Sequence, residues 1–185
     1  MVSDAAAEIA KFYTAPIILF GHSMGSMLAF EVARSLRREH CIEVDALVVS
    51  GHCAPQLEPR SPSVHHLEGR QLLERLGELY GAVPSEALDE PELIELMAHV
   101  AKADLTLSAT YRYVEESPLN CLVQVFGGKS DPWVNADELA QWNRQTTGPF
   151  NATLLSGGHF YLQEQMMERI LLTRLIHVCE SSRKR

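Results

Sequence analysis

The sequence is poor in cysteine and has none of the cysteine pairs that hold metals. Four cysteines occur in 185 residues, and no two of them form a CxxC pair. They are Cys41, Cys53, Cys121 and Cys179. Zinc sites and disulfide frameworks depend on closely spaced or paired cysteines. The sequence therefore predicts reduced thiols and no metal site.

An excess of positive charge and a long apolar run are also missing. The formal net charge is −8, which gives no attraction to a phosphate backbone or an anionic membrane. No apolar stretch is long enough to span a bilayer, and no signal-peptide pattern is present. We therefore expect a soluble cytoplasmic protein with neither nucleic acid nor membrane as a partner. P-loop, GxGxxG and HExxH motifs are absent too, so phosphate binding, dinucleotide binding and zinc proteolysis lack a motif.

The chain does contain the pattern of an α/β domain. With 46% hydrophobic and 22% charged residues, it is expected to form one compact domain over residues 1–185. Short apolar runs predict buried strands, and segments with apolar residues about four apart predict helices. The strands are expected at 17–20, 46–50, 122–126 and 152–155, with Gly21 ending the first, and helices at 5–12 and 26–39. Buried strands separated by helices predict a mostly parallel sheet.

Between the second and third predicted strands lies an insertion, at about 54–118, that is too long for one crossover connection. Its run 67–80 places leucines on one helix face, and Pro91 stands where a first helical turn would begin. The leucines are Leu72, Leu73, Leu76 and Leu79, and we interpret most of them as ordinary core. The insertion as a whole is expected to be a helical lid.

The central motif is GxSxG, formed by Gly21, His22, Ser23, Met24 and Gly25 between a predicted strand and a predicted helix. In this setting the serine occupies a strained turn that projects its hydroxyl above the sheet, and its neighbours must be small for strand and helix to approach. Ser23 is therefore the predicted nucleophile. The backbone N–H of Met24, at the helix start, is the predicted oxyanion donor.

A serine nucleophile needs a histidine base and a carboxylate that orients it. His159 ends a glycine-rich loop after the last strand, and Asp131 follows another glycine loop after the preceding strand. Both loops leave the carboxyl ends of strands, where ligands bind in open α/β sheets. The resulting order of Ser23, Asp131 and His159 is that of α/β-hydrolases.

Each candidate has an alternative reading. Asp131 precedes Pro132 and could instead form an Asx turn, and Asp137 is a rival carboxylate at an expected helix start. His22 is expected to pack rather than to act as base. His52 follows the second strand but lacks a glycine hinge. The remaining histidines are expected at the surface or in the lid: His40, His65, His66, His99 and His177.

Four stretches carry a family resemblance: GHSMGSMLAFEVAR, KADLTLSATYRY, VFGGKSDPWV and GGHFYL. They resemble the type II thioesterases of non-ribosomal peptide and polyketide synthases and the medium-chain thioesterase of animal fatty-acid synthesis. The resemblance implies an α/β-hydrolase fold, the triad named above and a helical lid over an acyl site. The triad itself needs no cofactor. The resemblance also implies a substrate carried on the phosphopantetheine arm of an acyl or peptidyl carrier protein. A carboxylesterase or lipase of the same fold, or a catalytically weak binding module, remains the alternative.

The early position of the nucleophile leads to a last expectation. Sheets of this family have further strands before the nucleophile strand, so we expect an amino-terminally truncated form that lacks about two βα units, roughly 60 residues at ~30 per unit. The first strand would then be an exposed edge that favours self-association. One oxyanion donor would also be missing, which costs roughly 10² to 10³-fold in rate.

Overall fold

The computed structural model describes residues 1–14, 16–60, 64, 66–80, 83–163, 169–170, 172–173 and 175–176. Two compact units make up the chain: Met1–Pro59 with Val114–Arg185, and Arg60–Tyr113. The second unit falls within the insertion expected at about 54–118. The predictions for His65, His177 and Cys179 lie outside the described residues.

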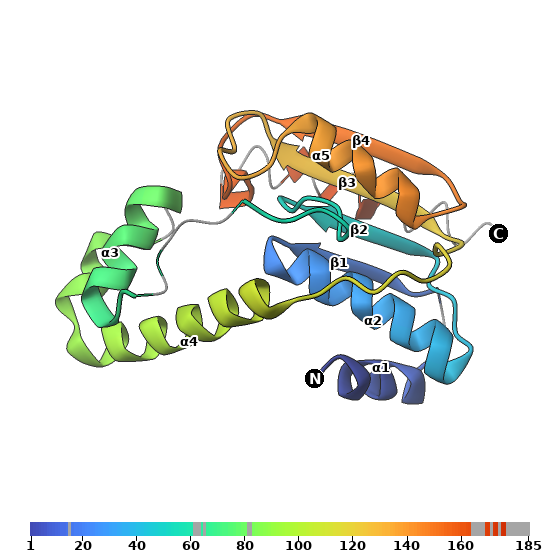
Figure 1. Cartoon of the computed structure of the whole chain (residues 1–185), viewed down its shortest axis with the longest axis horizontal. Helices are drawn as coiled ribbons and strands as arrows, with labels where there is room; N and C mark the ends of the chain where they lie inside the picture. Colours follow the sequence, from blue (N-terminus) through green and yellow to red (C-terminus); the bar gives the residue numbers. More distant parts are fainter. Residues whose placement is uncertain are drawn as a thin grey trace. The chain divides into compact units, whose positions relative to one another are not determined.

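The first unit contains the predicted parallel sheet (Figure 1). Its strands lie in the order β1-β2-β3-β4. They are β1 (Ile18–His22), β2 (Ala46–Ser50), β3 (Leu122–Gly128) and β4 (Phe150–Leu155). The prediction that Gly21 ends the first strand is wrong. Gly21 and His22 still pair with Val49 and Ser50 of β2, because a glycine keeps both backbone groups that a ladder needs.

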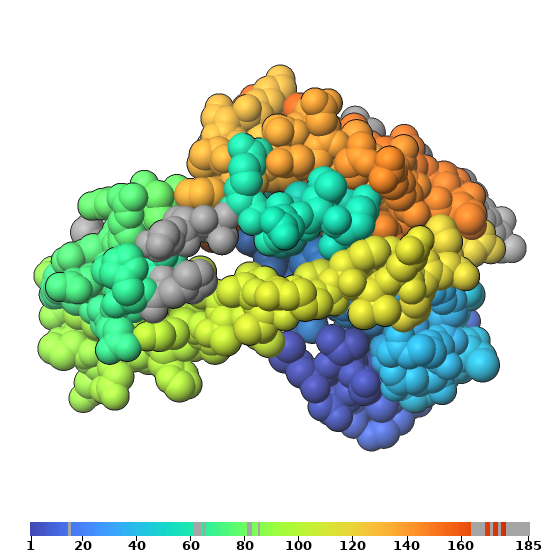
Figure 2. All heavy atoms as spheres, viewed as in Figure 1, coloured from blue at the N-terminus to red at the C-terminus, as the bar shows by residue number. Residues whose placement is uncertain are grey.

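Helix α2 (Met24–His40) covers part of this sheet, and helix α1 (Val2–Lys11) packs against α2 (Figure 2). Ala6 of α1 is completely buried. α2 in turn packs on β1 and β2. This unit also contains the short helix α5 (Ala136–Ala140) and the 3₁₀ helices η2 (Gln141–Gln145) and η3 (Tyr161–Gln163).

The core of the first unit centres on β2, all five residues of which are buried. Val48 belongs to a buried cluster with Phe126, Leu155 and Tyr161. Elsewhere in the unit, the rings of Phe30 and Trp142 meet edge to face with centroids 5.5 Å apart. Packing on both faces of the sheet explains the continuous apolar run of β2.

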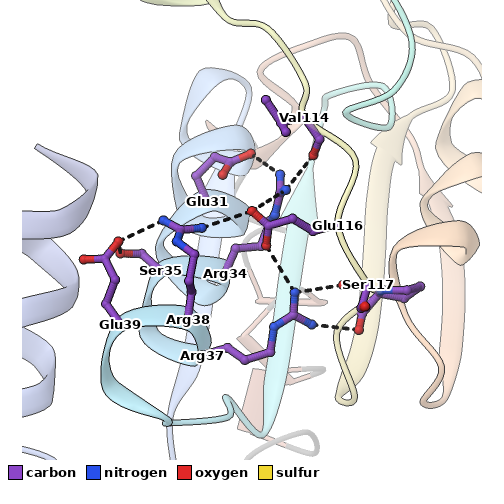
Figure 3. A network of polar contacts seen from close by, with 10 residues as sticks. Glu31, Arg34, Ser35, Arg37, Arg38, Glu39, Val114, Glu116 and Ser117 are labelled. Atoms are coloured by element: carbon purple, nitrogen blue, oxygen red, sulfur yellow. Dashed lines mark hydrogen bonds and ion pairs between the residues drawn. The ribbon is translucent and has the colours of Figure 1, made fainter.

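Three arginines of α2 bind the segment that leads into β3 (Figure 3). Arg34 is 3% exposed and forms ion pairs of 2.8 Å with both Glu31 and Glu116. Arg37 donates to the carbonyls of Ser117 and Pro118, and Arg38 pairs with Glu116 at 3.1 Å. Burial raises the pKa of the Glu116 carboxyl, but the hydrogen bond and charge of Arg34, together with Arg38 and Arg37, outweigh it and leave this pKa below its usual value. The network therefore fixes the approach to β3.

The second unit consists of α3 (Gly69–Tyr80), η1 (Ser85–Asp89) and α4 (Pro91–Thr110). α4 begins at Pro91, as predicted. Leu72 and Leu73 are buried core, whereas the other two leucines of the predicted face are half-buried. Among the described residues of both units, no helix combines the length and apolarity needed to cross a membrane.

Candidate active site

Ser23 lies in a strained turn between β1 and α2. Its backbone has φ 53° and ψ −125°, a left-handed conformation that L-residues rarely adopt. The turn is tied to the end of β2, because the Ser23 N–H donates to the carbonyl of Ser50 at 2.7 Å. The buried Ser26 hydroxyl adds a second tie, since it accepts from the Ser50 N–H at 3.0 Å and lies 2.9 Å from the Gly21 carbonyl. The strain is thus held by neighbouring hydrogen bonds.

The two glycines of the motif are not equivalent. A Cβ at Gly21 would lie 2.0 Å from the Gly25 carbonyl oxygen, so strand and helix approach too closely there for any side chain. At Gly25 itself, an added Cβ would meet nothing within 4 Å. The requirement for a small residue therefore holds before Ser23 but not after it. Gly25 contributes its backbone carbonyl to the close contact, but a Cβ on Gly25 itself would face open space, so the expectation of crowding on both sides of the serine is wrong.

Ser23, His159 and Asp131 form a continuous hydrogen-bond chain. The distance from Ser23 Oγ to His159 Nε2 is 2.9 Å, and that from His159 Nδ1 to Asp131 Oδ2 is 2.8 Å. The Asp131 side chain is fully buried and that of His159 is 5% exposed. A carboxylate only accepts hydrogen bonds, so Nδ1 of the neutral ring carries the proton and Nε2 can accept from the serine hydroxyl.

Two glycine loops bring the histidine and the aspartate together. A Cβ at Gly128 would lie 2.2 Å from the Gly158 carbonyl oxygen, so the end of β3 and the loop after β4 touch backbone to backbone. The Ser130 N–H also donates to the carbonyl of Gly157 at 2.9 Å. Gly157 has φ 112°, which favours glycine. Glycine at these positions is what allows both side chains to reach one site.

The two candidate carboxylates, Asp131 and Asp137, have different surroundings in the structure. Asp131 does form the Asx turn considered above, since its Oδ1 accepts from the Trp133 N–H at 2.9 Å, while Oδ2 faces His159. The turn and the pairing with His159 use different oxygens of one carboxylate. Asp137 is exposed in the first turn of α5, which Asn135 and Glu138 cap reciprocally.

Comparison with known proteins places this arrangement in a family. A family model described as Thioesterase domain matches residues 1–179. The chain belongs to the thioesterase domain family. It is 32% identical over 170 residues to the gramicidin S biosynthesis protein GrsT of Aneurinibacillus migulanus, covering 92% of this chain and 66% of GrsT. It is 38% identical over 152 residues to the thioesterase PikA5 of Streptomyces venezuelae, covering 82% of this chain and 53% of PikA5.

Solved thioesterase structures share the fold. The RedJ thioesterase of the prodiginine pathway of Streptomyces coelicolor is 31% identical with a TM-score of 0.83, covering 96% of this chain and 66% of RedJ. The type II thioesterase BorB of the borrelidin cluster is 32% identical with a TM-score of 0.77, covering 96% of this chain and 73% of BorB. The predicted α/β-hydrolase fold and thioesterase family are thereby confirmed. The chain spans about two thirds of GrsT and about half of PikA5.

The other histidines near this thioesterase-type site have different partners. The Nδ1 of His52 lies 2.9 Å from the Cys53 carbonyl, and burial together with the nearby His159 lowers the pKa of His52. The Nδ1 of His22 lies 2.8 Å from the Ser50 hydroxyl. Burial, and then the charge of His159, lowers the pKa of His22 to about 4, although Asp131 acts in the opposite direction. The packing role predicted for His22 is therefore incomplete, because this ring also has a polar partner.

Sequence reasoning missed Ser50 and Tyr161, whose hydroxyls lie 2.5 Å apart beside this site. Burial raises the pKa of Tyr161 to about 12, against the opposing hydrogen bond with Ser50, so the phenol stays neutral. The position of Ser50, at the end of the strand next to the nucleophile strand, is a signal that could have pointed to it. Met24, the predicted oxyanion donor, is the first residue of α2, where a backbone N–H has no partner within the helix.

Proposed function

We propose that this chain is a serine thioesterase that hydrolyses acyl groups from the phosphopantetheine arms of carrier proteins. The observation that carries the proposal is the chain of hydrogen bonds from Ser23 through His159 to the buried Asp131. Such a chain activates a serine hydroxyl for attack on a carbonyl carbon. Relatives named for gramicidin S biosynthesis and for the borrelidin cluster support carrier-bound acyl groups as the substrate class.

In the proposed reaction, Ser23 Oγ attacks the thioester carbonyl while its proton passes to His159 Nε2. Asp131 holds the ring and stabilises the imidazolium that forms. The Met24 N–H donates to the oxyanion of the tetrahedral intermediate. The pantetheine thiol leaves with the proton from His159, which is easy because thiols have a pKa near ~8.5. Water, deprotonated by His159, then releases the free acid and regenerates Ser23.

The first test is covalent labelling and turnover by the purified chain. We expect a fluorophosphonate to label Ser23, and acyl-carrier thioesters to turn over faster than simple acyl esters. Ser23→Ala and His159→Ala should each remove labelling and turnover, because the triad acts as a unit. Asp131→Asn should have a milder effect. Ser117→Ala, which changes an exposed serine in the segment before β3, is the matched control.

The outcomes separate the candidate functions. More than a few per cent of turnover in Ser23→Ala would show that the nucleophile is another group. Faster turnover of simple esters than of carrier thioesters would favour a carboxylesterase of the same fold. Labelling without turnover of either substrate class would favour a binding module.

We further propose that the helical unit Arg60–Tyr113 is the lid that gates entry of the acyl-pantetheine arm. Its helix α4 leaves several large apolar side chains exposed, as a gating element of low local stability would. The exposed side chains on α4 are Leu93, Leu96, Val100 and Leu107. Backbone hydrogen exchange should therefore be faster in α3 and α4 than in β2. Equal protection of these helices and of β2 would contradict a gate.

A further inference from the structure

A second hydrogen-bonded group lies directly beside the candidate base. The ring centroids of His22 and His159 are 5.2 Å apart, with the planes tilted by 48°. Phe160 meets His159 edge to face at 5.1 Å and contacts His22 at 5.5 Å. The His159 ring therefore packs against His22 in addition to its hydrogen bonds with Ser23 and Asp131.

His22 is itself held in place by two buried hydroxyls. Its Nδ1 lies 2.8 Å from Ser50 Oγ, which lies 2.5 Å from the Tyr161 hydroxyl. Ser50 and Tyr161 are each 1% exposed. The same Ser50 accepts the Ser23 N–H through its carbonyl. One residue at the end of β2 thus connects the turn that holds Ser23 with the ring that packs on His159.

Packing alone does not explain these polar groups. The Nε2 of His22 is buried and has no hydrogen-bond partner among the described residues. Burying an unpaired polar atom costs free energy, so an apolar ring would fill this space at lower cost. A histidine here also remains neutral, since burial lowers its pKa to about 4. A neutral neighbour does not repel the positive charge that forms on His159 during proton transfer.

Gly51 completes the enclosure of both rings. Its φ of +64° favours glycine, and a Cβ there would lie 2.9 Å from Cε1 of His22 and 3.5 Å from Cε1 of His159. The backbone after β2 therefore lies against both rings. A side chain at this position would crowd the His22 ring.

We propose that Tyr161, Ser50 and His22 form a positioning relay that orients the His159 ring for proton transfer from Ser23. The three residues act through His159 and do not touch the substrate. The inference rests on the proposed function of Ser23 as a nucleophile. It adds a role to residues outside the triad.

The experiment measures fluorophosphonate labelling of Ser23 in the whole chain, which needs no thioester substrate. The variants are Tyr161→Phe, His22→Phe and the double variant, since each single change keeps an aromatic ring and removes one relay hydrogen bond. The control is Val123→Ala, a buried change near the start of β3, away from the strand ends that bear the site. Labelling is resolved into the maximal rate constant, the reagent concentration at half-maximal rate and the final labelled fraction.

We expect each single variant to lower the maximal rate constant about 10-fold, part of the 10²- to 10⁴-fold that a positioned base supplies. The half-maximal concentration and the final labelled fraction should not change. The double variant should also lose about 10-fold, rather than the ~100-fold expected of independent sites, because both changes interrupt one relay. Val123→Ala should keep the rate constant of the unaltered chain.

Three results would overturn the relay. They are an unchanged rate constant in His22→Phe, multiplied losses in the double variant, and losses confined to the labelled fraction, which would indicate instability alone. A chain that is labelled but turns over no thioester would refute the proposed function and leave the relay supported if the variants behave as expected. A chain that is not labelled at all would refute both.

Discussion

Replacement of Gly21 by alanine tests how closely strand β1 and helix α2 must approach at the nucleophile. The new Cβ would lie 2.0 Å from the oxygen and 2.3 Å from the carbonyl carbon of Gly25, and 2.6 Å from the backbone nitrogen of Ser26. All three atoms belong to the backbone, so no side chain can rotate away. Real Cβ contacts are essentially never below 3.0 Å, so strand and helix must separate by about 1 Å.

This displacement should lower both the stability of the chain and the rate at which Ser23 is labelled. Overpacking of a core typically costs about 1–3 kcal/mol, and a rigid backbone clash belongs at the upper end. At roughly 2–4 °C per kcal/mol for a chain of this size, Gly21→Ala should lower Tm by about 6–12 °C. Because a 1 Å misplacement of reacting groups can cost about 10²-fold, the labelling of Ser23 by a fluorophosphonate should slow by about that factor in the molecules that remain folded.

Gly25→Ala is the matched control, because its Cβ would meet nothing within 4 Å. Alanine loses less backbone entropy than glycine in a helix, so this variant should be as stable as the unaltered chain or more stable by about 0.5 kcal/mol. Thermal unfolding by circular dichroism gives Tm, and mass spectrometry of the labelled chain gives the rate. Equal Tm values for Gly21→Ala and Gly25→Ala would refute the close approach of β1 and α2.

Three further predictions concern charge and assembly. His22 has a pKa of about 4 in the fold against 6.5 in a free chain, so the free energy of unfolding should decrease as the pH falls from about 6.5 to 4. Urea titrations should show a smaller decrease over this range for His22→Phe. Glu116→Gln should destabilise the chain by about 1–2 kcal/mol at pH 7, and this difference should vanish as the pH falls below the lowered pKa of Glu116. β1 pairs only with β2 among the described strands, and Phe20 of β1 is 42% exposed, so this edge should favour self-association. Sedimentation should detect association that depends on concentration and that Phe20→Lys weakens. A monomer at all concentrations would contradict this prediction.

The sequence predicts strands best where burial is complete. β2 spans the predicted residues 46–50, because both faces of this strand are covered. β4 begins two residues earlier than predicted, at Phe150, where most residues are not buried and Asn151 interrupts the apolar pattern. β1 and β3 both extend into glycines that resemble turn signals. Ladder hydrogen bonds between neighbouring strands decide these ends, and a single strand's sequence does not contain them.

In the candidate site too, residues that stand in a short sequence pattern could be predicted, whereas residues that only the fold brings together could not. Ser23, Asp131 and His159 could be found because each stands in a short pattern with its own backbone requirement, a strained turn or a glycine loop. The link from Tyr161 through Ser50 to His22 has no such pattern, since 111 residues separate Tyr161 from Ser50. It exists only because the parallel register places His22 directly opposite Ser50.

That register also explains why the site forms at one edge of the sheet. In register with β2, β1 ends at His22 and β2 at Ser50, and β3 and β4 end together at Gly128 and Leu155. Parallel strands that end side by side direct their following loops to one edge. The turn at Ser23 and the loops bearing the aspartate and the histidine therefore meet there. A shift of one residue between β1 and β2 would move His22 away from Ser50 and reverse the face to which the His22 side chain points.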